Sequence, residues 1–167
     1  MEPIEQRGST RCTTKVGLAA GTTTTITVGA DAQYAIGGKA YKYTAASNQA
    51  TPTTDIITGA AFVAVTAGYG CAFVVGLNAA GAIKVAQGPL SALDSATSGS
   101  TALFADTSPA FPSSLPADFC PVGYIVTKVG ASGSSWTFGS SNLAGPPSNV
   151  LHTFVDVQNL PSRPQIS

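Results

Sequence analysis

The stretch that decides the fold is residues 59–77, GAAFVAVTAGYGCAFVVGL, which contains no charged side chain. Its length equals that of a membrane-spanning helix, about 20 residues. The order of its residues argues against such a helix, because residues 67–70 (AGYG) form a turn signal in its middle. The flanks also lack the one-sided excess of Lys and Arg that accompanies a membrane span. We therefore predict two β-strands joined by a turn, and no membrane association.

Within residues 71–77, side chains alternate between the two faces of an extended strand. One face carries Cys71, Phe73, Val75 and Leu77, and the other carries Ala72, Val74 and Gly76. Both faces are apolar, which is typical of a strand that is covered on both sides. The residues of the stretch expected to pack in the domain core or against a second copy are Phe62, Val63, Val65, Phe73 and Val75.

Short β-prone segments separated by turn formers continue along the chain. Residues 22–28 are rich in β-branched side chains, and Gly37-Gly38 separates two alternating runs as in a β-hairpin. Further strands are predicted at 62–65, 82–88, 121–129, 136–138 and 151–157. Residues 109–121 contain four prolines and predict a loop, held to the body by Phe104, Phe111, Leu115 and Phe119. This pattern predicts an all-β fold, an antiparallel β-sandwich or barrel of about eight to ten short strands.

The β domain is expected over residues 22–160, between an extended N-terminal arm (1–21) and a C-terminal tail (161–167). The arm mixes both charge signs and has neither a helical nor a strand period. One interpretation is a latch onto a neighbouring subunit, with Arg7, Arg11 and Lys15 as the partner contacts. The other is a mobile terminus. The first residues lack the apolar region of a signal peptide.

The charge content is the most unusual global property. Eight basic and eight acidic residues give a net charge of zero, which removes the field on which non-specific nucleic-acid binding depends. Charged residues make up 10% of the chain, against about 25% in an average soluble domain. Much of the 44% hydrophobic fraction is Ala, so the core of a monomer is expected to be thin. Both properties favour an obligate homo-oligomer.

No residue pattern predicts chemistry. Cys12, Cys71 and Cys120 have the spacing of neither a zinc site nor a dense disulfide framework, and we expect free thiols in a reducing cytoplasm. The one histidine, His152, has no triad signature around it, and no phosphate-binding loop is present. Most aspartates beyond the arm lie beside turns, where Asp commonly accepts hydrogen bonds from backbone amides. We therefore predict no enzyme activity, cofactor or metal.

Several segments together resemble a group of tailed-phage virion structural proteins. They are GKAYKYTAA with TPTTDIITGAAFVAV, then CAFVVGLNAAGAIKVAQGP, FPSSLPADFCPVGYIVTKVG, SSWTFGSSN and VDVQNLPSRPQ, within residues 35–165. The most distinctive element runs from Pro116 to Tyr124. The resemblance carries no catalytic residues and implies a virion component that is assembled in the host cytoplasm.

Small β proteins of this type often bind the capsid exterior as decoration (cement) proteins, frequently as homotrimers. The resemblance therefore implies a protein that binds and stabilises the shell of the major capsid protein. The alternative is a head fibre, a tail adaptor or a receptor-binding virion protein. A glycan-binding tip would expose aromatic side chains, for which Tyr69 and Trp136 are the candidates.

Overall fold

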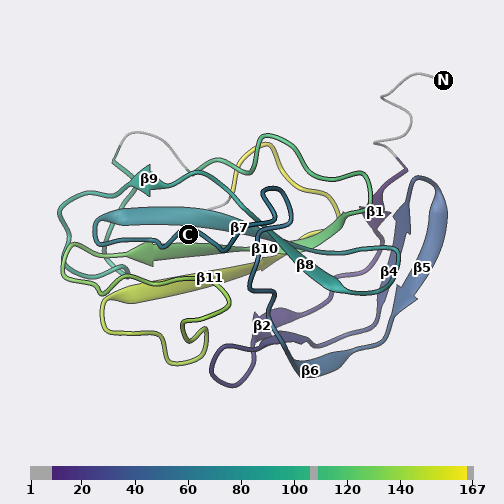
Figure 1. Ribbon diagram of the computed structural model, residues 1–167, viewed down its shortest axis with the longest axis horizontal. Helices are drawn as coiled ribbons and strands as arrows, with labels where there is room; N and C mark the ends of the chain where they lie inside the picture. The colour runs from purple at the N-terminus through teal and green to yellow at the C-terminus, as the bar shows by residue number, and fades with distance from the viewer. Residues whose placement is uncertain (1–8, 106–108, 165–167) are drawn as a thin grey trace.

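The computed structural model describes residues 9–105 and 109–164, and this part of the chain contains eleven strands and no helix (Figure 1). The strands are β1 (Arg11–Cys12), β2 (Leu18–Ala20), β3 (Ile26–Val28), β4 (Ala32–Ile36), β5 (Lys39–Tyr43), β6 (Ala46–Gln49), β7 (Tyr69–Leu77), β8 (Ile83–Gln87), β9 (Ser91–Ala92), β10 (Cys120–Val129) and β11 (Val150–Asp156). The predicted all-β fold is confirmed.

The strands form three antiparallel sheets. The largest has the order β11-β10-β7-β8, with β9 paired to the first residues of β7. Two three-stranded sheets, β1-β4-β5 and β2-β3-β6, pack on one face of it through contacts of β1 and β4 with β10 and of β2 with β11. The large sheet is open, because β11 and β8 form its edges. Of the two predicted architectures, the sandwich is therefore the observed one.

Strand β7 is covered on both faces, as its sequence predicts. Residues 70–77 are all buried. The face with Cys71, Phe73, Val75 and Leu77 belongs to the main core, beneath the two small sheets. On the other face, Val74 packs with Phe119 and with the partly buried Phe111 and Leu115 of the proline-rich loop. The loop therefore covers the second face of the sheet without being a strand.

A β-bulge in β10 allows residues at both ends of this strand to pack in the main core. The register against β7 shifts between Pro121 and Gly123. Cys120 and Val122 face the main core before the shift, whereas Ile125 and Val129 face it afterwards. Because the bulge contains one extra residue, even-numbered residues face the main core before it and odd-numbered residues face the main core after it. Proline is tolerated here because a bulge interrupts the hydrogen-bonded ladder.

Aromatic rings fill the centre of the main core. Phe73 packs against Phe62, Trp136 and Phe138, with ring centroids 5.1–6.1 Å apart. Trp136 and Phe138 are fully buried even though residues 136–138 form only an isolated bridge from Trp136 to Val65. The core is therefore bulkier than the aliphatic content of the sequence predicts.

The Gly37-Gly38 hairpin is confirmed. Both glycines have positive φ (57° and 82°), and β4 and β5 pair on either side of them, closing at Ile36 and Lys39. Two successive positive φ angles define the turn whose twist matches that of the flanking strands. Tyr41 packs against the main core, while Lys42 on the opposite face is exposed.

The described part of the predicted arm, residues 9–21, lies within the β domain. β1 pairs with β4, and β2 pairs with β3. Cys12, Val16 and Leu18 are buried in the main core. The β domain therefore begins before residue 22, the start that the sequence predicts. Three apolar side chains among polar neighbours are enough to anchor short strands, because other segments complete the sheets.

Two further segments differ from their predicted strands. Residues 22–25 form a turn before β3, in which the Thr25 amide donates to the Thr22 carbonyl. Residues 62–65 form no strand: Val65 makes an isolated bridge with Trp136, and the preceding Ala61 makes one with Thr54. In this segment Phe62 and Val65 are buried, whereas Val63 is 61% exposed and does not belong to the core of the protomer. Of the two expectations for Val63, core packing does not hold in the protomer, and packing against a second copy stays a prediction.

Replacement of Gly76 tests the cover of the second sheet face. A Cβ at this position would lie 2.5 Å from the Phe119 ring and 2.7 Å from the Cys120 carbonyl oxygen. Overpacking of this kind costs about 1–3 kcal/mol. We expect Gly76→Ala to lower the free energy of unfolding by that amount in urea denaturation. Adding Phe119→Leu should recover part of the loss; strictly additive effects of the two changes would contradict the contact.

Candidate functional site

The aspartates accept hydrogen bonds from backbone amides, as their positions beside turns predict. One carboxylate oxygen of each described aspartate accepts from a loop or strand amide: Asp31 from Ala45, Asp55 from Gln87, Asp94 from Ala96, Asp118 from Ala79 and Asp156 from Leu18. Among the described residues, no three His, Cys, Asp or Glu side chains are grouped so that they could hold a metal ion.

The three cysteines are buried and free. Burial raises the pKa of Cys71 and of Cys120 to about 12. A thiol is nucleophilic as the thiolate, so these two groups stay protonated and unreactive near neutral pH.

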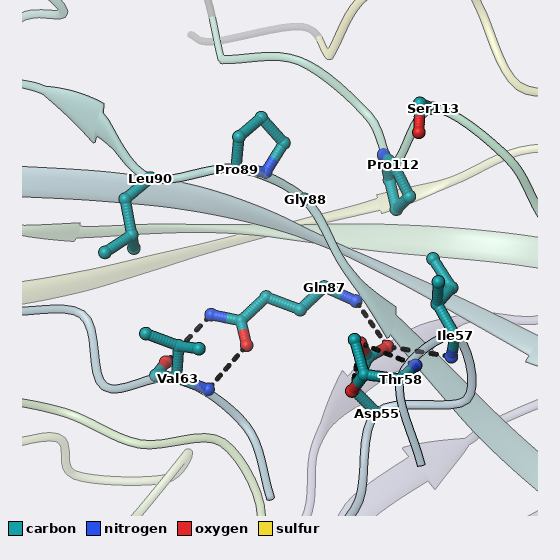
Figure 2. Close-up of a pocket in the computed structure, with 10 residues that line it drawn as sticks. All are labelled: Asp55, Ile57, Thr58, Val63, Gln87, Gly88, Pro89, Leu90, Pro112 and Ser113. Carbon is teal, nitrogen blue, oxygen red and sulfur yellow. Dashed lines mark hydrogen bonds between the residues drawn. The ribbon is translucent and has the colours of Figure 1, made fainter. Parts of the chain in front are cut away.

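A surface cleft of about 340 Å³ lies where the end of β8 meets the loop before β7 and the proline-rich loop (Figure 2). Its lining comes from residues 55–63, 87–90 and 112–113. Most of the lining side chains are apolar, among them Ile57, Val63, Pro89, Leu90 and Pro112. Three of these apolar side chains are exposed, namely Ile57 (40%), Val63 (61%) and Pro89.

Asp55 fixes one wall of the cleft. Its side chain is 95% buried and accepts hydrogen bonds from the amides of Ile57, Thr58 and Gln87 and from the Thr58 hydroxyl, over 3.0–3.3 Å. A carboxylate with four donors is satisfied by the fold itself. Asp55 therefore acts as a structural acceptor, which joins the turn at residues 55–58 to strand β8.

Gln87 fixes the opposite wall. Its side-chain amide donates to the Val63 carbonyl and accepts from the Val63 amide, each over 2.8 Å (Figure 2). The side chain thus reproduces the paired hydrogen bonds of a neighbouring strand. This pairing holds the backbone of residue 63 in place while its side chain points to solvent.

The cleft is suited to apolar contact. Its one ionisable side chain, Asp55, has both oxygens engaged in hydrogen bonds to the fold. Three exposed apolar side chains, on a backbone held by the hydrogen bonds of Asp55 and Gln87, form a rigid apolar surface. We refer to Ile57, Val63, Leu90 and Pro89 as the apolar rim.

A second polar cluster lies inside the main core. His152 and Thr127 are directly opposite one another on β11 and β10, and His152 Nδ1 shares a 2.9 Å hydrogen bond with the Thr127 hydroxyl. The His152 ring packs against Trp136 at a centroid distance of 4.5 Å, with the two ring planes tilted by 54°. Burial lowers the pKa of His152 to about 4, so the imidazole is neutral at pH 7.

The residues predicted as partner contacts are not brought together with the apolar rim. Arg11 and Lys15 are exposed on and after β1, and Arg7 lies outside the described residues. Of the predicted packing residues, Phe62, Val65, Phe73 and Val75 belong to the main core, and Val63 belongs to the rim. Of the two aromatic candidates for a glycan tip, Tyr69 is 42% exposed and Trp136 is fully buried.

Asp55 and Gln87 were not singled out by the sequence. In the sequence Asp55 is one of several aspartates beside turns, and Gln87 is a strand residue that precedes a Gly-Pro pair. Their roles depend on the approach of residues 55–63 to β8, which local sequence does not reveal.

Comparison of the chain with family profiles, with curated protein sequences and with solved structures finds no match. Over residues 9–105 and 109–164, no helix has the length and hydropathy required to cross a membrane.

Substitution of Asp55 by Asn tests its role as a structural acceptor. The amide has nearly the same shape but places an NH₂ group against either the Thr58 donors or the donors from Ile57 and Gln87. An unsatisfied buried donor costs about 1–3 kcal/mol. We expect Asp55→Asn to destabilise the fold by this amount in urea denaturation. The control is Asp94→Asn, since the exposed Asp94 accepts from Ala96, and its effect should stay within about 0.5 kcal/mol. Equal effects would contradict a special role for Asp55.

Proposed function

We propose that this chain is a structural protein of a tailed-phage virion and that it binds the outer surface of the major capsid protein shell as a decoration (cement) protein. The observation that carries the proposal is the apolar rim, a rigid apolar surface that offers contact and no chemistry. The low charge of the chain and its resemblance to phage virion proteins support the same function.

Two surfaces are available for partners in this proposal. The exposed Arg11 and Lys15, together with Arg7, supply cationic contacts to the capsid shell. The apolar rim supplies contacts between copies of the chain, in a homotrimer. Exposed apolar groups held on a rigid backbone lose little conformational entropy on association, which favours an interface.

Purified virions test the assignment. We expect the protein at a fixed molar ratio to the major capsid protein in quantitative mass spectrometry of particles, and labelled antibody on the head. We also expect Arg11→Glu with Lys15→Glu to weaken binding to capsids that lack the protein at least tenfold. Lys84→Glu, a charge reversal on β8, serves as the matched control and should bind normally. Labelling confined to the tail would overturn the decoration function in favour of a fibre, an adaptor or a receptor-binding role.

The self-association proposal has its own test. Because Val63 is exposed in the protomer, Val63→Asp should dissociate the oligomer while the far-ultraviolet circular dichroism of the folded protomer is retained. Native mass spectrometry should show a trimer for the unchanged chain and a monomer for the variant. Lys39→Asp, at an exposed position on β5, should keep the trimer. A monomeric unchanged chain at micromolar concentration would contradict this use of the rim.

A further inference from the structure

The single histidine and the single tryptophan of the chain are in contact inside the core. His152 comes from β11, whereas Trp136 comes from the connection between β10 and β11, residues 130–149. Trp136 also exchanges two backbone hydrogen bonds with Val65, over 2.8 and 3.0 Å. The Trp136–His152 contact therefore joins this connection to the edge strand of the large sheet.

One nitrogen of the imidazole has no partner. Nδ1 shares its hydrogen bond with Thr127, but Nε2 is buried without a hydrogen bond to any described residue. The Asn142 carbonyl accepts from the Trp136 indole N–H over 2.9 Å. The same carbonyl lies close enough to the imidazole to raise the pKa of His152 by hydrogen bonding, an effect that is smaller than the lowering by burial.

The surroundings offer no anion to a protonated ring. Residues 129–149 contain no charged side chain. On β11, Asp156 shares the face of His152 but lies four residues away and accepts from the Leu18 amide. On β7, Cys71 stands opposite Thr127 with its thiol protonated, and β2 carries no charge. Lys128 points to the other face of β10 and donates to the Ala102 carbonyl.

The sign of the pH effect follows from burial. The pKa of His152 is about 4 in the folded protein and about 6.5 in an exposed chain. Between these values the open form binds a proton that the folded form does not, so acid favours opening. The Trp136 ring attracts a cation and opposes this effect. A buried imidazolium, however, loses its hydration, and this cost exceeds what the Asn142 carbonyl returns by hydrogen bonding.

We propose that His152 and Trp136 form an acid-sensitive latch, which holds residues 131–149 on the sheet at neutral pH and releases them when the imidazole takes up a proton. In this proposal the opening leaves the backbone ladder between β7 and β10 paired, because neither His152 nor Trp136 belongs to it, and it uncovers the side of Phe73 on which Trp136 and Phe138 pack. This inference is independent of the proposed virion function.

Tryptophan fluorescence of the full chain reports on the latch directly, since Trp136 is the only tryptophan. We expect the emission maximum to shift to longer wavelength as the pH falls from 6.5 to 4, while the far-ultraviolet circular dichroism of the sheets is retained. Constant emission down to pH 4 would overturn the proposal. So would quenching with a midpoint at or above pH 6.5 and no wavelength shift, because that is the behaviour of an exposed histidine.

Hydrogen exchange locates the opening. After correction for the intrinsic rate, amides at residues 136–143 should exchange up to about tenfold faster for each unit of pH lost between 6.5 and 4. Amides of β7 should keep their protection. Equal acceleration in both segments would mean global unfolding and would overturn a local latch.

Two variants distinguish protonation of His152 from protonation of a carboxylate as the cause of the emission shift in acid. Thr127→Val with His152→Phe keeps a ring against Trp136 and removes both the titration and the hydrogen bond, so the emission should stay constant from pH 6.5 to 4. Asp156→Asn removes the one carboxylate on the same face of β11 and should keep the acid shift. A wild-type shift in the first variant, or its loss in the second, would overturn the proposal.

Discussion

The structure depends on the pairing of β7 with β10. Both strands are buried on both faces over most of their length, so neither can be stable at a protein surface. Once they pair, with Cys120 opposite Leu77 at one end and Val129 opposite Tyr69 at the other, two apolar faces must be covered at once. Burial on this scale is the dominant favourable term in folding.

The two faces are covered by different means. Two three-stranded sheets and the aromatic cluster around Phe73 cover one face, and the proline-rich loop with Phe111, Leu115 and Phe119 covers the other. A loop can cover a sheet because its side chains supply apolar area without a hydrogen-bonded ladder. Gly76 and the bulge after Pro121 are the local adjustments that allow this cover.

Many polar side chains form hydrogen bonds with the backbone of distant or neighbouring segments. The described aspartates each accept from a main-chain amide, and Gln87 pairs with residue 63 as a strand would. Of these aspartates only Asp55 is buried, whereas Asp31, Asp94 and Asp118 accept from backbone amides and remain exposed. The apolar rim and the His152–Trp136 contact both arise where irregular segments are fixed in this way.

The sequence by itself determined the all-β class, the two-faced burial of β7, the Gly37-Gly38 hairpin and the backbone role of the aspartates, because each depends on neighbouring residues. Only the tertiary structure decided that residues 9–21 belong to the domain, that Val63 is exposed while Phe62 and Val65 are buried, and that Trp136 meets His152. These outcomes depend on which distant segments meet. Alternation along one segment does not specify whether a core, a side chain such as Gln87 or solvent occupies the other side.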